Sequence, residues 1–267
     1  MILTVDIGNT NIKFGAWDKD ELVFVSRLQT NTLKTQDEYA INLVDILKLK
    51  ACNPSQFDGA IISSVVPPLS MALYEAVRDV IQTKRVFLVS PKLKTGIKLK
   101  LDSPDSLGSD MVCCAVAAAA KYTTPCIVVG MGTATTIFVL DKDGCFLGAS
   151  FAPGVVISLE ALSSRTAQLP HISLDSPAGI IGTNTVDCMK SGAVYGAACM
   201  LDGMLKRIKK ELNAPDAVVV ASGGIAPSII PYCEEPVAFD DSLVLTGLKI
   251  IYHMNWQDFE PAEDANG

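Results

Sequence analysis

The two halves of this sequence carry the same arrangement of strands and turns, and this repetition restricts the possible folds more than any other feature. Residues 3–10 read Leu-Thr-Val-Asp-Ile-Gly-Asn-Thr, and residues 127–134 read Ile-Val-Val-Gly-Met-Gly-Thr-Ala. Each is an apolar strand that enters a glycine turn, followed by a strand with a phenylalanine, an Asp-Lys-Asp turn and a third apolar run. A second pair of strands, 58–64 and 216–222, ends in small residues followed by proline. We therefore expect two similar α/β halves that face each other across a cleft, each with a glycine-turn hairpin.

Asp6, just before the first glycine turn, is the first candidate functional residue. Gly8 has no Cβ, so the backbone can approach a ligand closely, and Asn9 and Thr10 add an amide and a hydroxyl. A carboxylate at a strand end beside backbone N–H groups suits a phosphate held through Mg²⁺, because hard cations prefer oxygen ligands. The alternative is an ordinary β-hairpin with a solvated Asp6. The repetition of the turn in the second half favours the phosphate site.

Composition excludes several classes of partner. The 267 residues have a net charge of −7, which argues against nucleic acid or an anionic membrane as a standing partner. No charged leader precedes an apolar core, and no uninterrupted apolar run reaches about 18 residues, so we expect neither secretion nor membrane spanning. The eight cysteines form no C-x-x-C pair and lie mostly in apolar runs. We expect reduced thiols in a cytoplasmic protein.

Local patterns predict the order of the elements and a boundary near residue 117, which would separate domains 1–117 and 118–267. In the first half we expect strands at 2–7, 11–17, 21–28, 60–66 and 85–89, and helices at 35–50 and 67–82. In the second half we expect hairpins over 126–148, a turn at 151–154, helices at 155–164 and 184–212, strands at 218–220 and 248–253, and an acidic tail at 256–267. The order of strands and helices predicts mixed sheets covered by helices.

Asp110 is the second candidate functional residue. Residues 97–110 read as a connection, and residues 111–121 are almost all Ala, Val and Cys, which predicts a closely packed helix. Asp110 then lies at or near the helix N-terminus, where the helix dipole favours its charged form. It is either a helix cap only or a general base beside the cleft.

Glycines in the second half suggest close contacts. Gly192, Gly196 and Gly203 reduce the helix propensity of 184–212, so they are expected to admit another helix or a ligand. Gly223 and Gly224 follow the strand at 218–220 and leave room for a nucleotide. The sequence has neither a P-loop nor a complete G-x-G-x-x-G motif.

Taken in this order, the chain resembles type III pantothenate kinases, members of the superfamily of acetate kinase, sugar kinases, Hsp70 and actin (ASKHA) with duplicated RNase H-like domains. Residues 6–10 look like the first phosphate motif, 64–67 like the second strand end, 108–111 like G-x-D-R, 130–136 like D-x-G-T-A-x-T, 148–154 like G-G-x-I-x-P-G, 185–196 like T-x-x-x-x-x-S-G-x-x-x-G and 222–224 like T-G-G. The resemblance covers nearly the whole chain.

The resemblance implies ATP-dependent phosphorylation of pantothenate, the first step of coenzyme A synthesis. It implies that Asp110 is the general base and that Asp6 helps to hold Mg²⁺. Nucleotide contacts are implied for Asp6, Gly8, Asn9, Thr10, Gly132, Thr133, Thr136, Gly223 and Gly224, and substrate contacts for Gly108, Ser109 and Thr185. Thr185 would act from the neighbouring subunit of a dimer, and the family also uses a monovalent cation such as K⁺ or NH₄⁺.

Two departures from the motifs open alternatives. Gly130 stands where D-x-G-T has the acid associated with the monovalent cation, and Met111 stands where G-x-D-R has an arginine. A thioether cannot reproduce bidentate recognition of an anion by arginine. The chain is therefore a divergent pantothenate kinase that forms a homodimer, or a catalytically impaired relative resembling Bvg accessory factor homologues. The impaired relative would act as a regulator or pair with an intact paralogue. A kinase for another small hydroxylated substrate is the third alternative.

Overall fold

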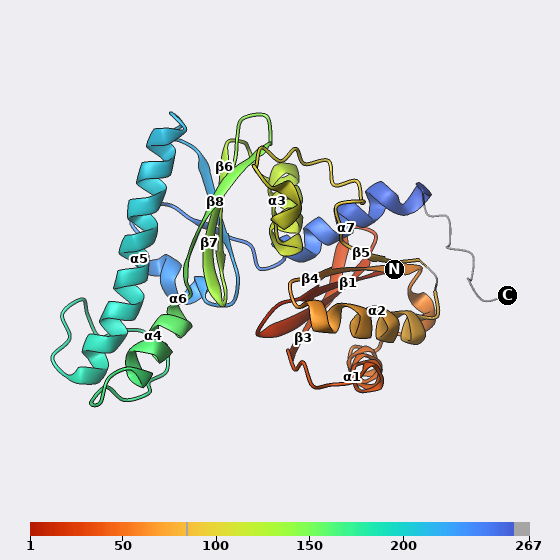
Figure 1. Cartoon of the computed structure of the whole chain (residues 1–267), viewed down its shortest axis with the longest axis horizontal. Coiled ribbons are helices and arrows are strands. Elements are labelled where there is room, and N and C mark those ends of the chain that lie inside the picture. Colours follow the sequence, from red (N-terminus) through yellow and green to blue (C-terminus); the bar gives the residue numbers. More distant parts are fainter. Residues whose placement is uncertain (84, 259–267) are drawn as a thin grey trace. The chain divides into compact units, whose positions relative to one another are not determined.

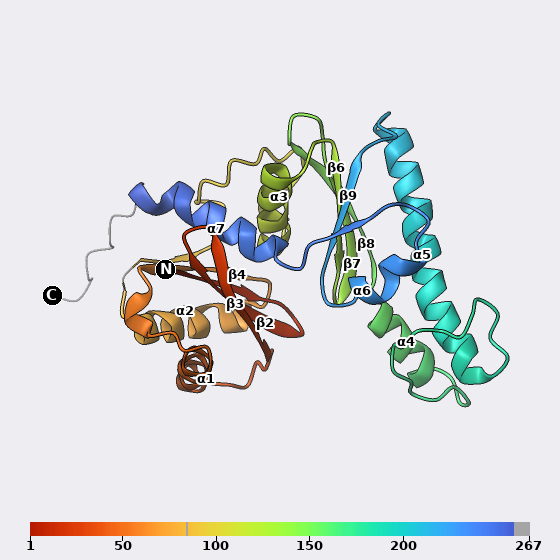
Figure 2. The ribbon, with the colours of Figure 1, turned by 180° about the vertical axis from the view of Figure 1, so that it is seen from behind.

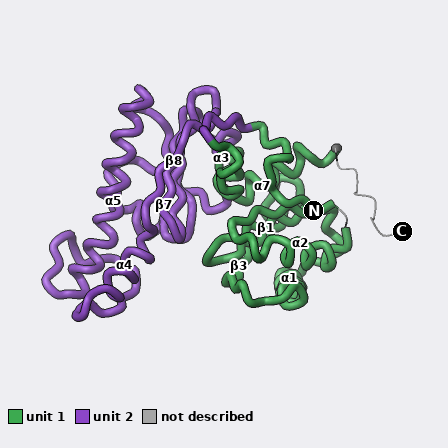
Figure 3. The backbone as a smooth tube through the Cα atoms, viewed as in Figure 1, with its two compact units in different colours: residues 1–96, 103–117, 243–267 green, residues 97–102, 118–242 purple. Residues whose placement is uncertain are grey.

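A computed structural model shows two α/β units and describes residues 1–83 and 85–258 (Figure 1). Unit 1 comprises residues 1–96, 103–117 and 243–267, and unit 2 comprises 97–102 and 118–242 (Figure 3). Each unit contains one five-stranded mixed sheet. Among the described residues, no helix combines the length and the apolar content that crossing a lipid bilayer requires.

The sheet of unit 1 has the strand order β3-β2-β1-β4-β5. Its strands are β1 (Ile2–Ile7), β2 (Asn11–Asp18), β3 (Glu21–Gln29), β4 (Gly59–Ser64) and β5 (Val86–Leu88). The first three form an antiparallel meander, whereas β4 and β5 join β1 in parallel. The predicted sequence of strands and helices in this half is confirmed, with ends within about two residues of the predicted ones.

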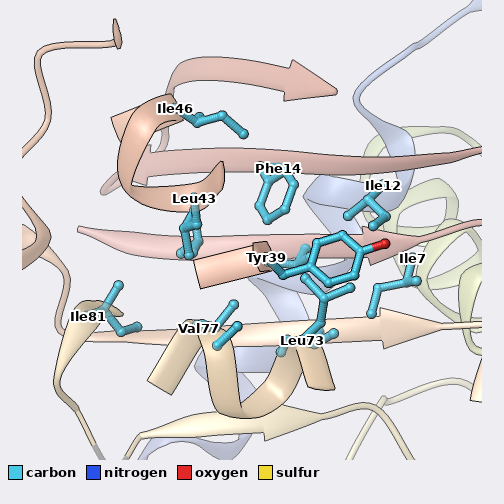
Figure 4. Close-up of a cluster of buried hydrophobic side chains, with 14 of the residues drawn as sticks. Ile7, Ile12, Phe14, Tyr39, Leu43, Ile46, Leu73, Val77 and Ile81 are labelled. Carbon is cyan, nitrogen blue, oxygen red and sulfur yellow. The ribbon is translucent and has the colours of Figure 1, made fainter. Parts of the chain in front are cut away.

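Helices cover both faces of this sheet, and the alternation of side chains along β1 decides which residues meet them. Helices α1 (Gln36–Leu49) and α2 (Pro67–Ile81) pack on one face. There, Leu3, Val5 and Ile7 join one core cluster with Tyr39 of α1, and Figure 4 shows the side chains of this cluster interlocking. Helix α7 (Leu243–Asn255) contacts β1 and β4, and its Leu245 lies against Gly15 beside Thr4 on the opposite face. Asp6 follows Thr4 by two residues and therefore belongs to the α7 face.

Unit 2 repeats this topology, which supports the predicted duplication. Its sheet has the order β10-β9-β6-β7-β8, in which β8-β7-β6 corresponds to the β3-β2-β1 meander. The strands are β6 (Cys126–Met131), β7 (Ala134–Leu140), β8 (Phe146–Pro153), β9 (Val218–Ser222) and β10 (Ala238–Phe239). Ile2 pairs with Gly59 in unit 1, and Cys126 pairs with Val218 in unit 2. Gly59 thus corresponds to Val218 in the structure. The comparison of the two sequence segments, 58–64 and 216–222, had instead aligned Gly59 with Ala217.

The helices of unit 2 gather beside its sheet (Figure 2). They are α4 (Val155–Ser164), α5 (Thr185–Glu211) and the short α6 (Ala226–Ile229), while α3 (Ser109–Lys121) runs from unit 1 into unit 2. Val194, Ala198, Leu201 and Leu205 of α5 share a core cluster with residues of β6, β7 and β9. Short 3-10 turns lie at Pro54–Gln56, Pro104–Ser106, Ile230–Tyr232 and Trp256–Asp258.

Three expectations need correction. Residues 248–253, predicted as a strand, belong to helix α7, because a short apolar run with β-branched residues fits either a strand or a buried helix. Residues 151–153 continue strand β8 instead of forming a turn. The compact units also differ from the predicted domains 1–117 and 118–267, since 97–102 group with unit 2 and the α7 segment with unit 1. Of the predicted tail, residues 259–267 lie outside the described part.

Helices α3 and α7 approach each other so closely that Gly247 is sterically required. A Cβ atom at Gly247 would lie 1.8 Å from the carbonyl oxygen of Cys113, and backbone cannot move aside as a side-chain tip can. We expect Gly247→Ala to destabilise the protein by about 3 kcal/mol or more, the upper range for overpacking. Thermal unfolding followed by circular dichroism measures this. Gly179→Ala is the control, because a Cβ there meets open space; equal midpoints for the two variants would contradict the expectation.

Candidate active site

Asp6 occupies the next-to-last position of β1, where the central strand of unit 1 approaches its carboxyl end. In the sheet it pairs with Lys13 of β2 on one side and with Ser63 of β4 on the other. Ser63 is completely buried. Asp6 is therefore held by the most regular part of the sheet, between a cationic and a hydroxyl neighbour.

Asp6 is half-buried, and its carboxylate is incompletely satisfied. Its Oδ1 atom has no hydrogen-bond partner. Burial, and next the negative charge of Asp110, raise the pKa of Asp6 to about 7, although Lys13 and the Ser63 hydroxyl oppose the shift. The alternative of an ordinary hairpin with a solvated Asp6 is thus wrong. A buried, unpaired carboxylate oxygen is costly unless it serves a ligand.

A tight turn joins β1 to β2 next to Asp6. The N–H of Gly8 donates to the carbonyl of Asn11 at 3.1 Å, and the carbonyl of Gly8 accepts from the Thr30 hydroxyl at 2.6 Å. Asn9 and Thr10 are exposed at its tip. The turn is anchored at its base and open at its tip, as a phosphate-binding turn requires. The predicted contacts of these residues with a nucleotide remain predictions.

Asp110 lies in the first turn of α3, as predicted. Its Oδ1 accepts from the N–H of Met111 at 2.8 Å, so part of the carboxylate satisfies the start of its own helix. A Cβ atom at Gly108 would come within 2.6 Å of Asp110 Oδ1, which explains the glycine two residues earlier. Burial raises the pKa of Asp110 above its ordinary value, against the lowering effect of these backbone hydrogen bonds. The residue is thus both a partner of its helix terminus and a base of increased proton affinity.

Sequence reasoning missed one residue of this cluster, Ser63. The Oγ atoms of Ser63 and Ser109 lie 2.9 Å apart, and the Ser109 hydroxyl is also within 3.0 Å of the backbone N–H and carbonyl of Ser64. The structure therefore brings Asp6, Ser63, Ser109 and Asp110 together at the end of β4 and the start of α3. The sequence offered one signal for Ser63. Parallel neighbouring strands such as β1 and β4 end at the same edge of a sheet, so a polar residue at the end of β4 is expected near Asp6 at the end of β1.

Met111 is buried, with 6% of its surface exposed. An arginine at this position would carry its guanidinium into the interior, where an unpaired charge is strongly unfavourable. The departure from G-x-D-R is therefore a change in packing as well as the loss of a cation.

The corresponding turn of unit 2 joins β6 to β7. The N–H of Gly132 donates to the carbonyl of Ala134 at 3.0 Å, and Gly132 and Thr133 are exposed. Gly154 donates to the Thr133 carbonyl at 3.1 Å, and a Cβ at Gly154 would lie 2.3 Å from that oxygen. Gly223 has a φ of +104°, and its Cβ would overlap the carbonyl oxygen of Met131. The structure thus places glycines of three predicted motifs, Gly132, Gly154 and Gly223, around the end of β6.

Gly130 is the counterpart of Asp6 in the repeat, and it carries no acid. It pairs with Thr136 across β6 and β7, and a Cβ atom at Gly130 would lie 2.5 Å from Thr136 Oγ1. An aspartate would fit only if this hydroxyl rotated away. Residues of unit 2 at this position therefore do not fit a carboxylate-bound monovalent cation.

The remaining predicted substrate residue, Thr185, begins helix α5. Asn184 caps the helix by accepting from the N–H of Asp187 at 2.9 Å, and Thr185 itself is exposed. Its predicted contact with pantothenate from a neighbouring subunit remains a prediction. Gly192 and Gly196 are exposed on the same helix, and Cβ atoms at Gly192, Gly196 and Gly203 would meet open space.

A cavity of about 240 Å³ lies in unit 2 between β7, β8 and the end of α5. It contains none of the predicted site residues. Its lining is mostly apolar and consists of Ile137, Val139, Leu147, Gly148, Ala149, Ser150, Ile208, Glu211 and Leu212.

The residues around Asp6 fit Mg²⁺. The unpartnered Asp6 Oδ1 is a hard oxygen donor, and Asp110 adds negative charge nearby. Among residues 1–83 and 85–258 no cluster of three or more His, Cys, Asp or Glu side chains forms a metal site from protein ligands alone. This agrees with Mg²⁺, which commonly binds through one or two carboxylates together with substrate phosphates.

The comparisons with known proteins agree with these observations. The family model described as type III pantothenate kinase matches residues 2–207. The chain is 39% identical over 256 residues to a type III pantothenate kinase of Shouchella clausii, covering 96% of this chain and 100% of that protein. It is 40% identical over 255 residues to one from a Geobacillus species, covering 96% and 98%.

A solved structure shares the fold at low sequence identity. A putative 2-dehydro-3-deoxygalactonokinase protein from Sinorhizobium meliloti has a TM-score of 0.64 and 14% identity, with all of both chains covered. This likeness, together with the two repeated sheets, confirms the predicted α/β fold of the sugar kinase and actin type. On the family match and the two relatives, the chain belongs to the type III pantothenate kinase family.

Proposed function

We propose that this protein transfers the γ-phosphoryl group of ATP to the hydroxyl of pantothenate. The observation that carries the proposal is the pairing of two carboxylates in unit 1, Asp6 with a free buried oxygen and Asp110 with increased proton affinity. A phosphoryl transferase of this kind needs mainly positioning and charge neutralisation. The membership of the chain in the type III pantothenate kinase family supports the choice of substrate.

In this mechanism Asp110 accepts the hydroxyl proton of pantothenate. The freed oxygen forms the bond to the γ-phosphorus, and the bond from that phosphorus to the bridging oxygen breaks, which releases ADP. Asp6 would hold Mg²⁺, which neutralises phosphate charge when bound. The tips of the turns at Gly8 and Gly132 would contact the phosphates, through Asn9, Thr10, Thr133 and Thr136.

A coupled assay of ADP release tests the proposal. Release should depend on pantothenate and give 4′-phosphopantothenate in equal amount. Pantetheine, which has the same hydroxyl but an amide in place of the carboxylate, is the informative comparison, because Met111 replaces an arginine. A folded protein that binds ATP but phosphorylates neither compound would support the regulatory or heterodimer alternative. Turnover of other hydroxylated compounds but not of pantothenate would support the third alternative, a kinase for another small hydroxylated substrate. The cytoplasmic location remains a prediction.

Dependence on K⁺ is expected to be absent. Gly130 supplies no carboxylate for a monovalent cation, so turnover and nucleotide affinity should be equal in K⁺ and in a bulky organic cation at the same ionic strength. Gly130→Asp should introduce a K⁺ response if Thr136 Oγ1 rotates away from the new side chain. Parallel titrations of both proteins in the two buffers measure this. A large K⁺ enhancement of the unmodified protein would count against the prediction.

We also propose a homodimer that uses the glycine face of α5. Large apolar side chains are exposed in unit 2, and exposed apolar surface can mark an interface. They include Phe151, Val156, Ile157, Leu162, Ile180, Ile181 and Val186. The open space at Gly192 and Gly196 would admit a second helix. The predicted alternative, pairing with an intact paralogue, would use the same face.

Substitution of Gly196 by leucine separates the interface from the stability of the protomer. Leucine has a higher helix propensity than glycine, and a Cβ atom here meets open space, so the protomer should be equally or slightly more stable to unfolding. Light scattering after gel filtration at micromolar concentration should show a dimer for the unmodified protein and a monomer for Gly196→Leu. Gly179→Leu is the control at another open glycine. A dimer that Gly196→Leu leaves intact would contradict the proposed face.

A further inference from the structure

Ser63 is a buried hydroxyl to which the proposed reaction assigns no role. It is completely inaccessible to solvent, and it pairs with Asp6 where β1 and β4 run in parallel. A polar side chain at such a position must have hydrogen-bond partners, because an unsatisfied buried hydroxyl is unfavourable. Its partners are the Ser109 hydroxyl, with 2.9 Å between the Oγ atoms, the Asp6 carboxylate and the Cys113 thiol.

The number of available hydrogens leaves two possible directions for the bonds between Ser63, Ser109 and Asp6. Each serine hydroxyl has one hydrogen to donate. When Ser63 donates to the Asp6 carboxylate, it must accept from Ser109, and Ser109 in turn accepts from the backbone N–H of Ser64 at 3.0 Å. The result is a chain of three donors that points from the end of β4 toward the carboxylate. Successive hydrogen bonds of this kind polarise and strengthen one another.

The opposite direction is possible only without a bond to Asp6. In that arrangement Ser109 donates to the carbonyl of Ser64, also at 3.0 Å, and Ser63 donates to Ser109. The carboxylate would then have no hydroxyl donor. A charged acceptor forms the stronger hydrogen bond, so the ionised Asp6 favours the first arrangement.

We propose that Ser63, aligned by Ser109, is a positioning residue that orients the Asp6 carboxylate for Mg²⁺ and thereby sets the affinity for the Mg²⁺-nucleotide. The unpartnered Asp6 Oδ1 supports this, because a carboxylate restrained by Ser63 still presents a free donor atom. Groups that hydrogen-bond to metal ligands typically contribute 10- to 100-fold to metal affinity. The inference rests on the nucleotide and Mg²⁺ part of the proposed function and does not depend on the identity of the second substrate.

Calorimetric binding of a nonhydrolysable ATP analogue tests the inference without turnover. In saturating Mg²⁺, Ser63→Ala should bind the analogue about 10- to 100-fold more weakly than the unmodified protein. In EDTA the two should bind equally, because the substitution acts through the metal ligand. Ser63→Cys keeps the size and a weak donor, so it should fall between them. Ser70→Ala is the matched control. Ser70 lies on helix α2, and its hydroxyl donates to Ser64 Oγ at 2.8 Å. The Ser70→Ala variant should bind the analogue as tightly as the unmodified protein does.

Ser109 gives a second, independent measurement. If it acts through Ser63, Ser109→Ala should weaken Mg²⁺-dependent binding, and the double variant should be no weaker than Ser63→Ala alone. Additive losses would overturn the alignment by Ser109. Equal Mg²⁺-dependent affinity for Ser63→Ala and the unmodified protein, or an equal loss in EDTA, would overturn the role of Ser63. Should Ser63→Ala not fold, unchanged binding by Ser63→Cys would overturn it instead. If the predicted binding pattern appears but pantothenate is not phosphorylated, the proposal of pantothenate as the substrate is refuted. The role of Ser63 in binding the Mg²⁺-nucleotide is then still supported.

Discussion

Asp110→Asn is expected to lower pantothenate turnover by roughly 10²- to 10⁴-fold, the usual effect of removing a general base. Affinity for the nucleotide should remain nearly unchanged. The amide oxygen of asparagine can still accept from the N–H of Met111, so the start of α3 is preserved while the proton acceptor is lost. Steady-state turnover and calorimetric nucleotide binding, measured on the same preparation, separate the two effects.

Asp105→Asn is the matched control, since Asp105 is an exposed acid in the turn before α3. It should have normal turnover. Because burial raises the pKa of Asp110, turnover of the unmodified protein should decline, as the pH falls, at a higher pH than for an ordinary aspartate. A parallel loss of turnover and nucleotide affinity in Asp110→Asn would instead assign Asp110 to nucleotide or metal binding.

Asp6→Asn is expected to have two opposite effects. Affinity for the Mg²⁺-nucleotide should fall by about 100-fold or more, because breaking a buried charge pair costs about 3 to 5 kcal/mol. The metal-free protein should meanwhile become more stable at high pH. The folded-state pKa of Asp6 is raised to about 7 from 3.8, so ionisation destabilises the folded protein.

The sign and pH range of the stability effect follow from that shift. The penalty is absent below pH 3.8, grows as the pH rises, and is complete above about pH 7, where it amounts to about 4 kcal/mol. In EDTA at pH 8, the midpoint of thermal unfolding should therefore be higher for Asp6→Asn than for the unmodified protein. The difference between the two midpoints should become smaller toward pH 5. Asp18→Asn, at the exposed end of β2, should show no such gap. A pH-independent difference would refute the buried charge as the cause.

Local patterns sufficed to predict the elements that hold the candidate site. The apolar strand before Gly8 and the Ala- and Val-rich run after Asp110 have unambiguous periodicity and composition, and both elements appear where they were expected. The position of Asp110 at a helix start follows from local sequence alone. Its proximity to Asp6 does not, because the two residues lie far apart in the chain and meet only through the packing of β4 and α3.

The features that sequence patterns could not provide depend on register and long-range packing. Ser63 has no motif, and its role emerges only because β4 pairs with β1 in a register that sets it beside Asp6. The contact that a Cβ atom at Gly108 would make with the Asp110 carboxylate also becomes visible only in the folded chain. Residues 248–253 of α7 were predicted as a strand because a short apolar run with β-branched residues fits either a strand or a buried helix.

The assignment of α7 to unit 1 also has a consequence for biosynthesis. This helix follows all of unit 2 in the chain, yet it contacts β1 and β4 and covers the face of the sheet that bears Asp6. All of unit 2 is synthesised before it. Unit 1 therefore cannot complete its core during translation until unit 2 has been synthesised, whereas unit 2 does not wait for α7. Order of synthesis and order of completion are thus reversed in this fold.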